Sequence, residues 1–338
     1  MYEPPADLPE AALAAGLRAH YGLAVEATTL LPLGQDTAAR VYRVRASAAA
    51  YFLKARRGTA DVAGLAVPRY LHDHGIAEVV APLPTARGAL WADVAGHALA
   101  LYPFVAGSTG MAHGMAPAQW RAYGALLRRV HAAPVAPALA AVLRRDAFVP
   151  AGAALVRELD ARIDGRISTD PVARELAPLW RGRRDTIRRL ADRAEALGRR
   201  VAERPPGNVL CHGDIHTNNV LLDADGALRV VDWDDTLLAP KERDLLFVVG
   251  GGLNRALVGP REEAAALRGY GPTALDQGAL AYYRCARALS DLGEYGAQAL
   301  GPSDLGEPRR RAAIDRFLTL FQPGRLVESA LASDDAAP

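Results

Sequence analysis

The feature that most constrains this chain is the segment of residues 211–235, which reads CHGDIHTNNVLLDADGALRVVDWDD. Within it, Asp214 follows a His-Gly pair, and Asn219 comes five positions after that aspartate. A second aspartate, Asp232, ends an apolar stretch shortly afterwards. Any fold proposed for the chain has to bring these polar residues close together in space.

The same segment predicts a β-hairpin. The runs Asn219-Val-Leu-Leu and Ala227-Leu-Arg-Val-Val read as short strands, and Asp223-Ala-Asp-Gly226 between them is a strong turn signal. A hairpin brings its two ends together, so we expect Asn219 and Asp232 to lie near each other.

The order of these residues matches a known plan for phosphoryl transfer. Protein kinases place a carboxylate for the acceptor hydroxyl and two oxygen ligands for magnesium as H-x-D-x-x-x-x-N followed by a metal-binding Asp. Asp214, Asn219 and Asp232 occupy these positions, and hard oxygen ligands suit Mg²⁺. A surface hairpin whose Asp and Asn cap turns explains any one of them equally well. The complete string predicts an ATP-dependent kinase.

Length and composition limit the number of domains, the partners and the location that we expect. A chain of 338 residues is long enough for two lobes, and 50% hydrophobic residues with 23% charged residues are ordinary for a globular protein. The net charge of +2 gives no support for a nucleic-acid binder. The sequence contains no run of 18 apolar residues, so we expect no membrane span. The N-terminus lacks signal-peptide features, and the two cysteines form no disulfide framework. We expect a cytoplasmic protein with neither nucleic acid nor membrane as partner.

The chain contains one markedly basic stretch. Residues 172–203 are rich in arginine and helical in pattern, but acidic residues are interspersed and no aromatic residues alternate with the arginines. This composition favours a solvated helix face over a nucleic-acid surface.

The N-terminal part predicts a nucleotide site. A helix is expected at 8–20, and strands at Leu30–Leu33 and Arg40–Ala46 flank a short loop. Gly34 and Thr37 in that loop are candidates to contact nucleotide phosphates, although a tight β-turn fits nearly as well. The next strand ends in Lys54, which matches the lysine that grips the α- and β-phosphates in kinases.

The partner of that lysine is open in the sequence. The helix expected at 60–74 contains no glutamate, and its aspartates, Asp61 and Asp73, are poorly placed. Residues 78–105 read as strands that lead into a hinge at about 101–107. Tyr102 and Phe104 are candidates for the adenine site, with a plain buried strand as the alternative. We therefore expect an N-lobe of residues 1–103 and a mostly helical C-lobe of residues 104–338.

These residues resemble the aminoglycoside phosphotransferase family of small-molecule kinases. The match is specific at 212–219 and at Asp232-Trp233-Asp234, and the surrounding 232–247 and 282–295 look most like the spectinomycin phosphotransferases. The resemblance implies an α+β, bilobal, protein-kinase-like fold, with Mg²⁺ and ATP, or alternatively GTP. By the same resemblance Asp214 would accept the proton of the acceptor hydroxyl, Asn219 and Asp232 would hold magnesium, and Lys54 would hold the phosphates.

The acceptor implied by the resemblance is the hydroxyl of an aminoglycoside or aminocyclitol antibiotic, in a resistance enzyme. Such a molecule is cationic, so its pocket needs further carboxylates, and the candidates are Asp235, Glu242, Asp291 and Glu294. Asp291 and Glu294 lie three apart on one predicted helix, where solvent-facing charges are the alternative interpretation. Two other functions stay open. One is a kinase of a metabolite such as choline, homoserine or a sugar, and the other is a nucleotide-binding pseudokinase.

Overall fold

The computed structural model describes residues 8–31, 38–47, 49–165, 169–204, 207–301 and 306–332. The chain forms two compact units. The first unit contains Met1–Arg144 and His212–Leu237, and the second contains Arg145–Cys211 and Leu238–Pro338. The predicted lobe boundary near residue 104 falls inside the first unit, and the division into two lobes there stays a prediction.

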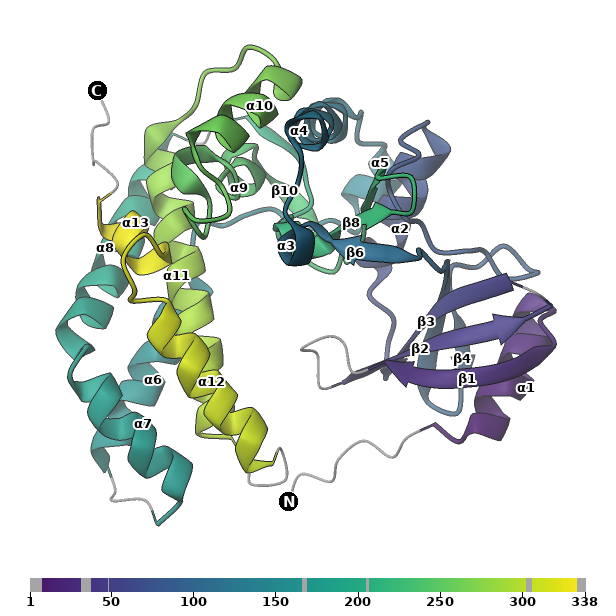
Figure 1. The fold of residues 1–338 in the computed structure, drawn as a ribbon, viewed down its shortest axis with the longest axis horizontal. Coiled ribbons are helices and arrows are strands. Elements are labelled where there is room, and N and C mark those ends of the chain that lie inside the picture. The colour runs from purple at the N-terminus through teal and green to yellow at the C-terminus, as the bar shows by residue number, and fades with distance from the viewer. Residues whose placement is uncertain are drawn as a thin grey trace. The chain divides into compact units, whose positions relative to one another are not determined.

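The first unit is built on an antiparallel sheet with the strand order β1-β2-β3-β5-β4 (Figure 1). Its strands are β1 Val25–Leu31, β2 Ala39–Ala46, β3 Ala49–Arg57, β4 Ala92–Val94 and β5 His97–Pro103. Successive side chains of a strand point to opposite faces. Leu53 and Ala55 of β3 therefore face one side, where they form a core with Leu13 and Leu17 of helix α1 (Glu10–Tyr21). Lys54 lies on the other face of the sheet.

The first unit also contains a smaller sheet that carries the predicted hairpin. Its strands are β6 Gly107–Thr109, β8 Val220–Asp223 and β9 Leu228–Val230, in the order β6-β8-β9. The backbone N–H of Asp223 donates to the carbonyl of Ala227 across the turn at 3.0 Å. The hairpin prediction is thus confirmed. The helices of this unit are α1, α2 Val62–Asp73, α3 Gly110–His113, α4 Pro117–Ala132 and α5 Pro137–Ala140, with a 3₁₀ turn at Thr217–Asn219.

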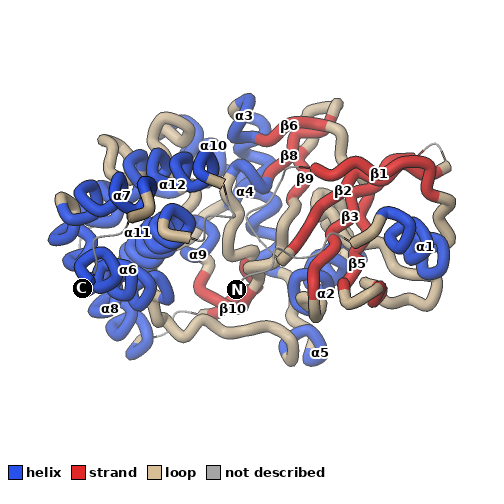
Figure 2. The backbone as a smooth tube through the Cα atoms, turned by 90° about the horizontal axis from the view of Figure 1, so that it is seen from below, coloured by secondary structure: helices blue, strands red, loops and turns tan. Residues whose placement is uncertain are grey.

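Helices dominate the second unit (Figure 2). They are α6 Ala151–Gly165, α7 Pro171–Arg181, α8 Arg184–Glu203, α9 Glu242–Leu245, α10 Pro260–Tyr270, α11 Gln277–Ala299, α12 Glu307–Thr319 and α13 Leu326–Ala332, with a 3₁₀ turn at Val249–Gly251. A short sheet pairs β7 Asn208–Cys211 with β10 Leu237–Pro240. The long helix α11 packs on α6, α8 and α12. Its buried residues include aromatic and small side chains that let these neighbours approach closely.

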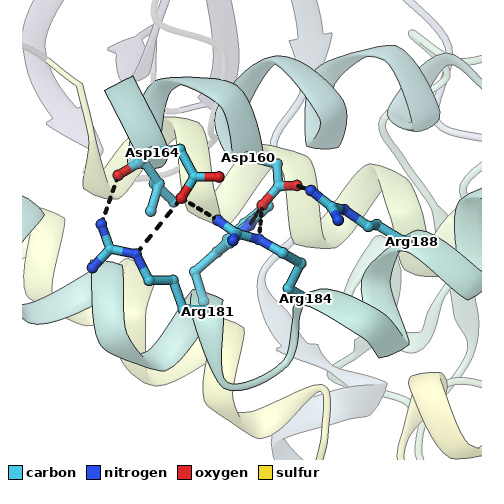
Figure 3. A network of polar contacts seen from close by, with 7 residues as sticks. Asp160, Asp164, Arg181, Arg184 and Arg188 are labelled. Atoms are coloured by element: carbon cyan, nitrogen blue, oxygen red, sulfur yellow. Dashed lines mark hydrogen bonds and ion pairs between the residues drawn. The ribbon is translucent and has the colours of Figure 1, made fainter. Parts of the chain in front are cut away.

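The basic stretch at 172–203 is partly solvated, as expected, since Arg181, Arg188 and Arg189 are exposed. It forms α7 and α8, and three of its arginines bind carboxylates of α6 (Figure 3). Arg184 and Arg188 donate to Asp160, and Arg184 also reaches an oxygen of Asp164 at 2.7 Å. Burial opposes ionisation of Asp160, but the hydrogen bonds from the two arginines outweigh it and hold the pKa of this carboxyl below its usual value. These arginines join helices within the second unit.

The predicted fold class is confirmed in its secondary structure. Strands concentrate in the first unit and helices in the second, as expected for an α+β protein. The helices expected at 8–20 and 60–74 are α1 and α2. Within the described ranges, no helix is both long enough and apolar enough to cross a membrane.

Candidate active site

The loop of residues 212–219 is fixed by the buried ring of His212. Nδ1 of His212 accepts the backbone N–H of Asp214 at 3.2 Å, and Nε2 lies 3.0 Å from the carbonyl oxygen of Val231. These two contacts fit the tautomer that carries its proton on Nε2. The imidazole also packs on the indole of Trp233 at a centroid distance of 4.5 Å. His212 thus ties the loop to the segment that follows β9 and has a structural role.

Gly213 allows the same loop to approach the chain at 235–237. Its φ of +85° lies in the left-handed region that favours glycine. A Cβ atom added there would be 2.4 Å from the carbonyl oxygen of Asp235 and 3.0 Å from a methyl of Leu237. A larger residue would therefore displace the backbone that carries Asp214.

Asp214 is held from several sides and still reaches solvent. Its backbone carbonyl accepts the side-chain amide N–H of Asn219 at 2.9 Å. Its carboxylate lies 3.5 Å from Nε2 of His216, and 22% of the side-chain surface is exposed. One residue further on, the hydroxyl of the buried Tyr123 donates to the carbonyl of Ile215 at 2.8 Å. A fixed carboxylate that a substrate can reach has the properties of a proton acceptor.

Asn219 and Asp232 lie at the two ends of the hairpin, as the sequence predicted. The backbone N–H of Val231 donates to the carbonyl of Asn219 at 3.1 Å, which places Asp232 beside it. Since the amide nitrogen of Asn219 bonds to Asp214, its Oδ1 is the atom that a cation would meet. Asp232 adopts φ +64°, which is uncommon outside glycine, and 54% of its side chain is exposed. Backbone outliers of this kind concentrate at functional sites.

Electrostatics around Asp232 favour a cation. Partial burial and the neighbouring carboxylates of Asp234 and Asp214 raise the pKa of Asp232, while Lys54 and His212 oppose the rise. Carboxylate and amide oxygens around such a point are the ligands that Mg²⁺ prefers. The residues present therefore fit a magnesium ion.

Lys54 lies between the two acidic residues of the Asp-Trp-Asp segment. Its ammonium contacts the carboxylate of Asp234 and is 3.8 Å from Oδ1 of Asp232. Only 19% of the lysine side chain is exposed. It also lines a small pocket with side chains that include those of Asp61, Tyr102 and Asp234. The structure thus brings Lys54 and Asp232 together.

The sheet face that carries Lys54 also presents aromatic rings. Phe52 and Tyr102 meet edge to face at a centroid distance of 6.2 Å, and the guanidinium of Arg43 lies 4.7 Å from the ring centroid of Phe104. Burial, and then the carboxylates of Asp234 and Asp232, raise the pKa of Tyr102, so its hydroxyl keeps its proton at neutral pH. Such a face offers stacking area to a base, but Gly34 and Thr37, the predicted phosphate-loop residues, lie outside the described residues.

The predicted acceptor residues are divided between the units. Asp235, in the first unit, is exposed and pairs with Arg144 at 3.1 Å. Glu242, in the second, is buried and accepts from the ammonium of Lys241 at 2.7 Å. A second bond to Glu242 comes from the backbone N–H of Asp276 at 3.0 Å. Both carboxylates therefore already have protein partners.

The two helix acids of α11 differ from each other. Asp291 is buried and pairs with Arg287 at 2.9 Å, so the interpretation of Asp291 as a solvent-facing charge is wrong. Glu294 is partly exposed and accepts the side-chain amide N–H of Gln298 at 2.9 Å. Their part in acceptor binding stays a prediction.

Sequence reasoning missed Tyr123 and the pairing of Asp234 with Lys54. Tyr123 anchors the loop from α4, and nothing local in the sequence connects it with Ile215. Asp234, which belongs to the Asp232-Trp233-Asp234 match, is the direct partner of Lys54, a pairing that no local feature of the sequence indicates.

Comparisons with known proteins give a family match and similar solved structures. The family described as "Phosphotransferase enzyme family" matches residues 29–289. The crystal structure of spectinomycin phosphotransferase APH(9)-Ia with ADP and spectinomycin is 30% identical, with a TM-score of 0.87 over 97% of this chain and 99% of that chain. Its AMP-bound complex gives 30% identity and a TM-score of 0.82 over 95% of this chain and 98% of that chain.

A more distant similarity concerns the fold alone. Macrolide 2'-phosphotransferase MphH from Brachybacterium faecium is 22% identical, with a TM-score of 0.53 over 91% of this chain and 98% of that chain. A comparison with curated protein sequences gives no match. Together the structural similarities confirm the predicted kinase-like fold.

Proposed function

The chain belongs to the phosphotransferase enzyme family, and from this premise we propose that it transfers the γ-phosphate of ATP to a hydroxyl of an aminocyclitol or aminoglycoside antibiotic. The observation that carries the proposal is the gathering of Asp214, Asn219, Asp232 and Lys54 in one compact unit. These are the four groups that the kinase plan of phosphoryl transfer requires.

ATP is the proposed donor, with GTP as the alternative. The spectinomycin phosphotransferase structures contain ADP and AMP, which supports an adenine nucleotide here. Lys54 would bind the phosphates as a point charge. Phe52, Tyr102 and Phe104 supply aromatic surface on the same sheet face, which supports a base site next to the lysine.

Magnesium is the proposed metal. Asn219, through its amide oxygen, and Asp232, through its carboxylate, would hold it. When bound, the ion would neutralise charge on the β- and γ-phosphates. The repulsion among the carboxylates of Asp214, Asp232 and Asp234 would fall at the same time, which supports binding.

In the proposed reaction the acceptor oxygen forms a bond to the γ-phosphorus, and the bond from that phosphorus to the β–γ bridging oxygen breaks. ADP leaves with the bond electrons, and the hydroxyl proton passes to the carboxylate of Asp214. His212, Asn219 and Tyr123 contribute by holding the loop in place. The transition state is loose, so positioning and charge neutralisation supply most of the rate.

Spectinomycin is the acceptor we test first, because the similarity to its phosphotransferase extends over nearly the whole of both chains. A role in antibiotic resistance and a cytoplasmic location, where ATP is available, are part of the proposal. Asp235, Glu242, Asp291 and Glu294 stay the candidates that would offset the positive charge of the acceptor.

The test is a screen of purified protein with ATP and Mg²⁺ against spectinomycin, aminoglycosides, macrolides, choline, ethanolamine and homoserine. Mass spectrometry should show that an antibiotic gains one phosphoryl group. A gain confined to choline, ethanolamine or homoserine would replace the antibiotic with a metabolite. If the protein bound ADP but phosphorylated none of these molecules, the kinase proposal would give way to a nucleotide-binding protein without transfer.

A further inference from the structure

Helix α2 offers Lys54 no carboxylate of its own. Protein kinases pair the strand lysine with a glutamate from the helix that follows it, but α2, which reads VAGLAVPRYLHD, contains no glutamate. Its one aspartate, Asp73, lies at the far end and binds Arg69 through a 2.9 Å hydrogen bond. Asp61, just before the helix, accepts the backbone N–H of Gly64 at 3.2 Å and acts as its N-cap. The usual source of the ion pair is therefore missing.

The packing of Gly64 indicates which carboxylate stands in for the missing helix glutamate. A Cβ atom on Gly64 would lie 3.2 Å from the Cα of Asp234 and 2.8 Å from a carboxylate oxygen of Asp61. Because residue 64 has no side chain, α2 packs directly against the backbone of Asp234. The helix thereby supports a carboxylate that comes from the Asp-Trp-Asp segment.

Asp234 makes the direct contact with Lys54, and Asp232 stands further from it. The lysine ammonium contacts Oδ2 of Asp234, whereas it is 3.8 Å from Oδ1 of Asp232. This arrangement leaves the more exposed carboxylate, that of Asp232, to a cation. With magnesium bound at Asp232, each of the two neighbouring acids would have its own positive partner.

We propose that Asp234 is the positioning residue of Lys54, and that in this chain it takes the role that a helix glutamate has in protein kinases. The inference rests on the proposed function, since it assumes that Lys54 binds nucleotide phosphates. It assigns Asp232 and Asp234 to different tasks, although the two lie only two residues apart.

The two tasks differ in their dependence on metal. ADP binding by titration calorimetry, in Mg²⁺ and again in EDTA, separates them without any turnover. Asp234→Asn should weaken ADP binding about tenfold under both conditions, because a contact between Lys54 and phosphate needs no metal. This factor corresponds to about one hydrogen bond between charged groups. Asp232→Asn should weaken ADP binding in Mg²⁺ only.

A double-mutant cycle with Lys54→Met tests whether Asp234 acts through the lysine. In that background Asp234→Asn should change the Kd of ADP by less than about twofold, because the lysine through which Asp234 acts is absent. A factor of about two is the margin within which independent changes are found to add. The matched control is Asp61→Asn, which keeps a good N-cap residue and should leave ADP affinity within about twofold of the wild type. Circular dichroism checks the fold of each variant, and Asp234→Ser provides a second substitution if Asp234→Asn is misfolded.

Three results would overturn the inference. Loss of ADP binding by Asp234→Asn in Mg²⁺ alone would make Asp234 a metal ligand. A full tenfold effect of the same change in the Lys54→Met background would show that it acts independently of the lysine. A large effect of Asp61→Asn would transfer the role to Asp61. In each case the wild type still binds ADP, whereas absence of ADP binding by the wild type would contradict the proposed function itself.

Discussion

Replacement of Gly213 by alanine tests whether the catalytic loop depends on a close approach that only glycine permits. The added methyl would meet the carbonyl oxygen of Asp235 at 2.4 Å, in a residue with φ +85°. The left-handed conformation costs a non-glycine residue about 1–2 kcal/mol. Overpacking costs about 1–3 kcal/mol more, since the atom in the way belongs to the backbone. We expect Gly213→Ala to lower the free energy of unfolding by about 2–5 kcal/mol.

Gly88→Ala is the matched control. Gly88 also has a positive φ, +82°, but a Cβ atom there would meet nothing within 4 Å. Its replacement should cost only the conformational part, about 1–2 kcal/mol, and leave turnover unchanged. Gly213→Ala should in addition reduce kcat about 10²-fold, the effect of a displacement of about 1 Å at a reacting group.

Urea unfolding followed by circular dichroism measures the free energies, and steady-state kinetics with the acceptor found in the screen measures kcat. If Gly213→Ala and Gly88→Ala were equally stable and equally active, the contact between the loop and Asp235 would not constrain the site.

Other parts of the structure give three further predictions. Tyr123→Phe removes the hydroxyl that donates to the carbonyl of Ile215. This change should lower the free energy of unfolding by about 1–3 kcal/mol and reduce kcat. An unchanged melting temperature would show that this hydrogen bond does not hold the loop. The bidentate bond from Arg310, and then a backbone N–H, lower the pKa of Asp170 to about 2. The carboxylate thus stabilises the fold above about pH 4 and loses this effect as the pH falls towards 2. Asp170→Asn should therefore lower the free energy of unfolding at pH 6 by about 1 kcal/mol after allowance for screening. The difference in stability between this variant and the wild type should shrink in titrations towards about pH 3. Asp291→Asn should raise the KM of a cationic acceptor, more so at low salt, with the Kd of ADP unchanged; an unchanged KM would remove Asp291 from the acceptor site.

The hairpin of residues 219–232 could be predicted because its determinants are local. The turn at 223–226 fixes the pairing of β8 with β9, and this pairing places Asn219 beside the segment that carries Asp232. The strand lysine was also predictable, because Lys54 directly follows the apolar run Tyr51-Phe-Leu.

Contacts between distant segments could not be predicted in the same way. Asp234 and Lys54 are 180 positions apart, and the packing of Gly64 of α2 against the backbone of Asp234 is equally non-local. The ion pairs of the α7 and α8 arginines could not be predicted from the pattern of a solvated helix face, because their partners, Asp160 and Asp164, lie on an earlier helix. The burial of Asp291 likewise depends on the packing of α11 within the second unit, which helical periodicity alone did not reveal.

The most direct test of the account compares the wild type with Asp214→Asn on spectinomycin, ATP and Mg²⁺. Phosphorylated spectinomycin is measured by mass spectrometry, and ADP affinity by calorimetry on the same preparations. We expect phosphorylation by the wild type, turnover lower by roughly 10²–10⁴-fold in Asp214→Asn, and the same ADP affinity in both. Equal turnover by the two proteins would contradict the assignment of Asp214 as the proton acceptor, and phosphorylation of no hydroxyl-bearing antibiotic would contradict the proposed acceptor class.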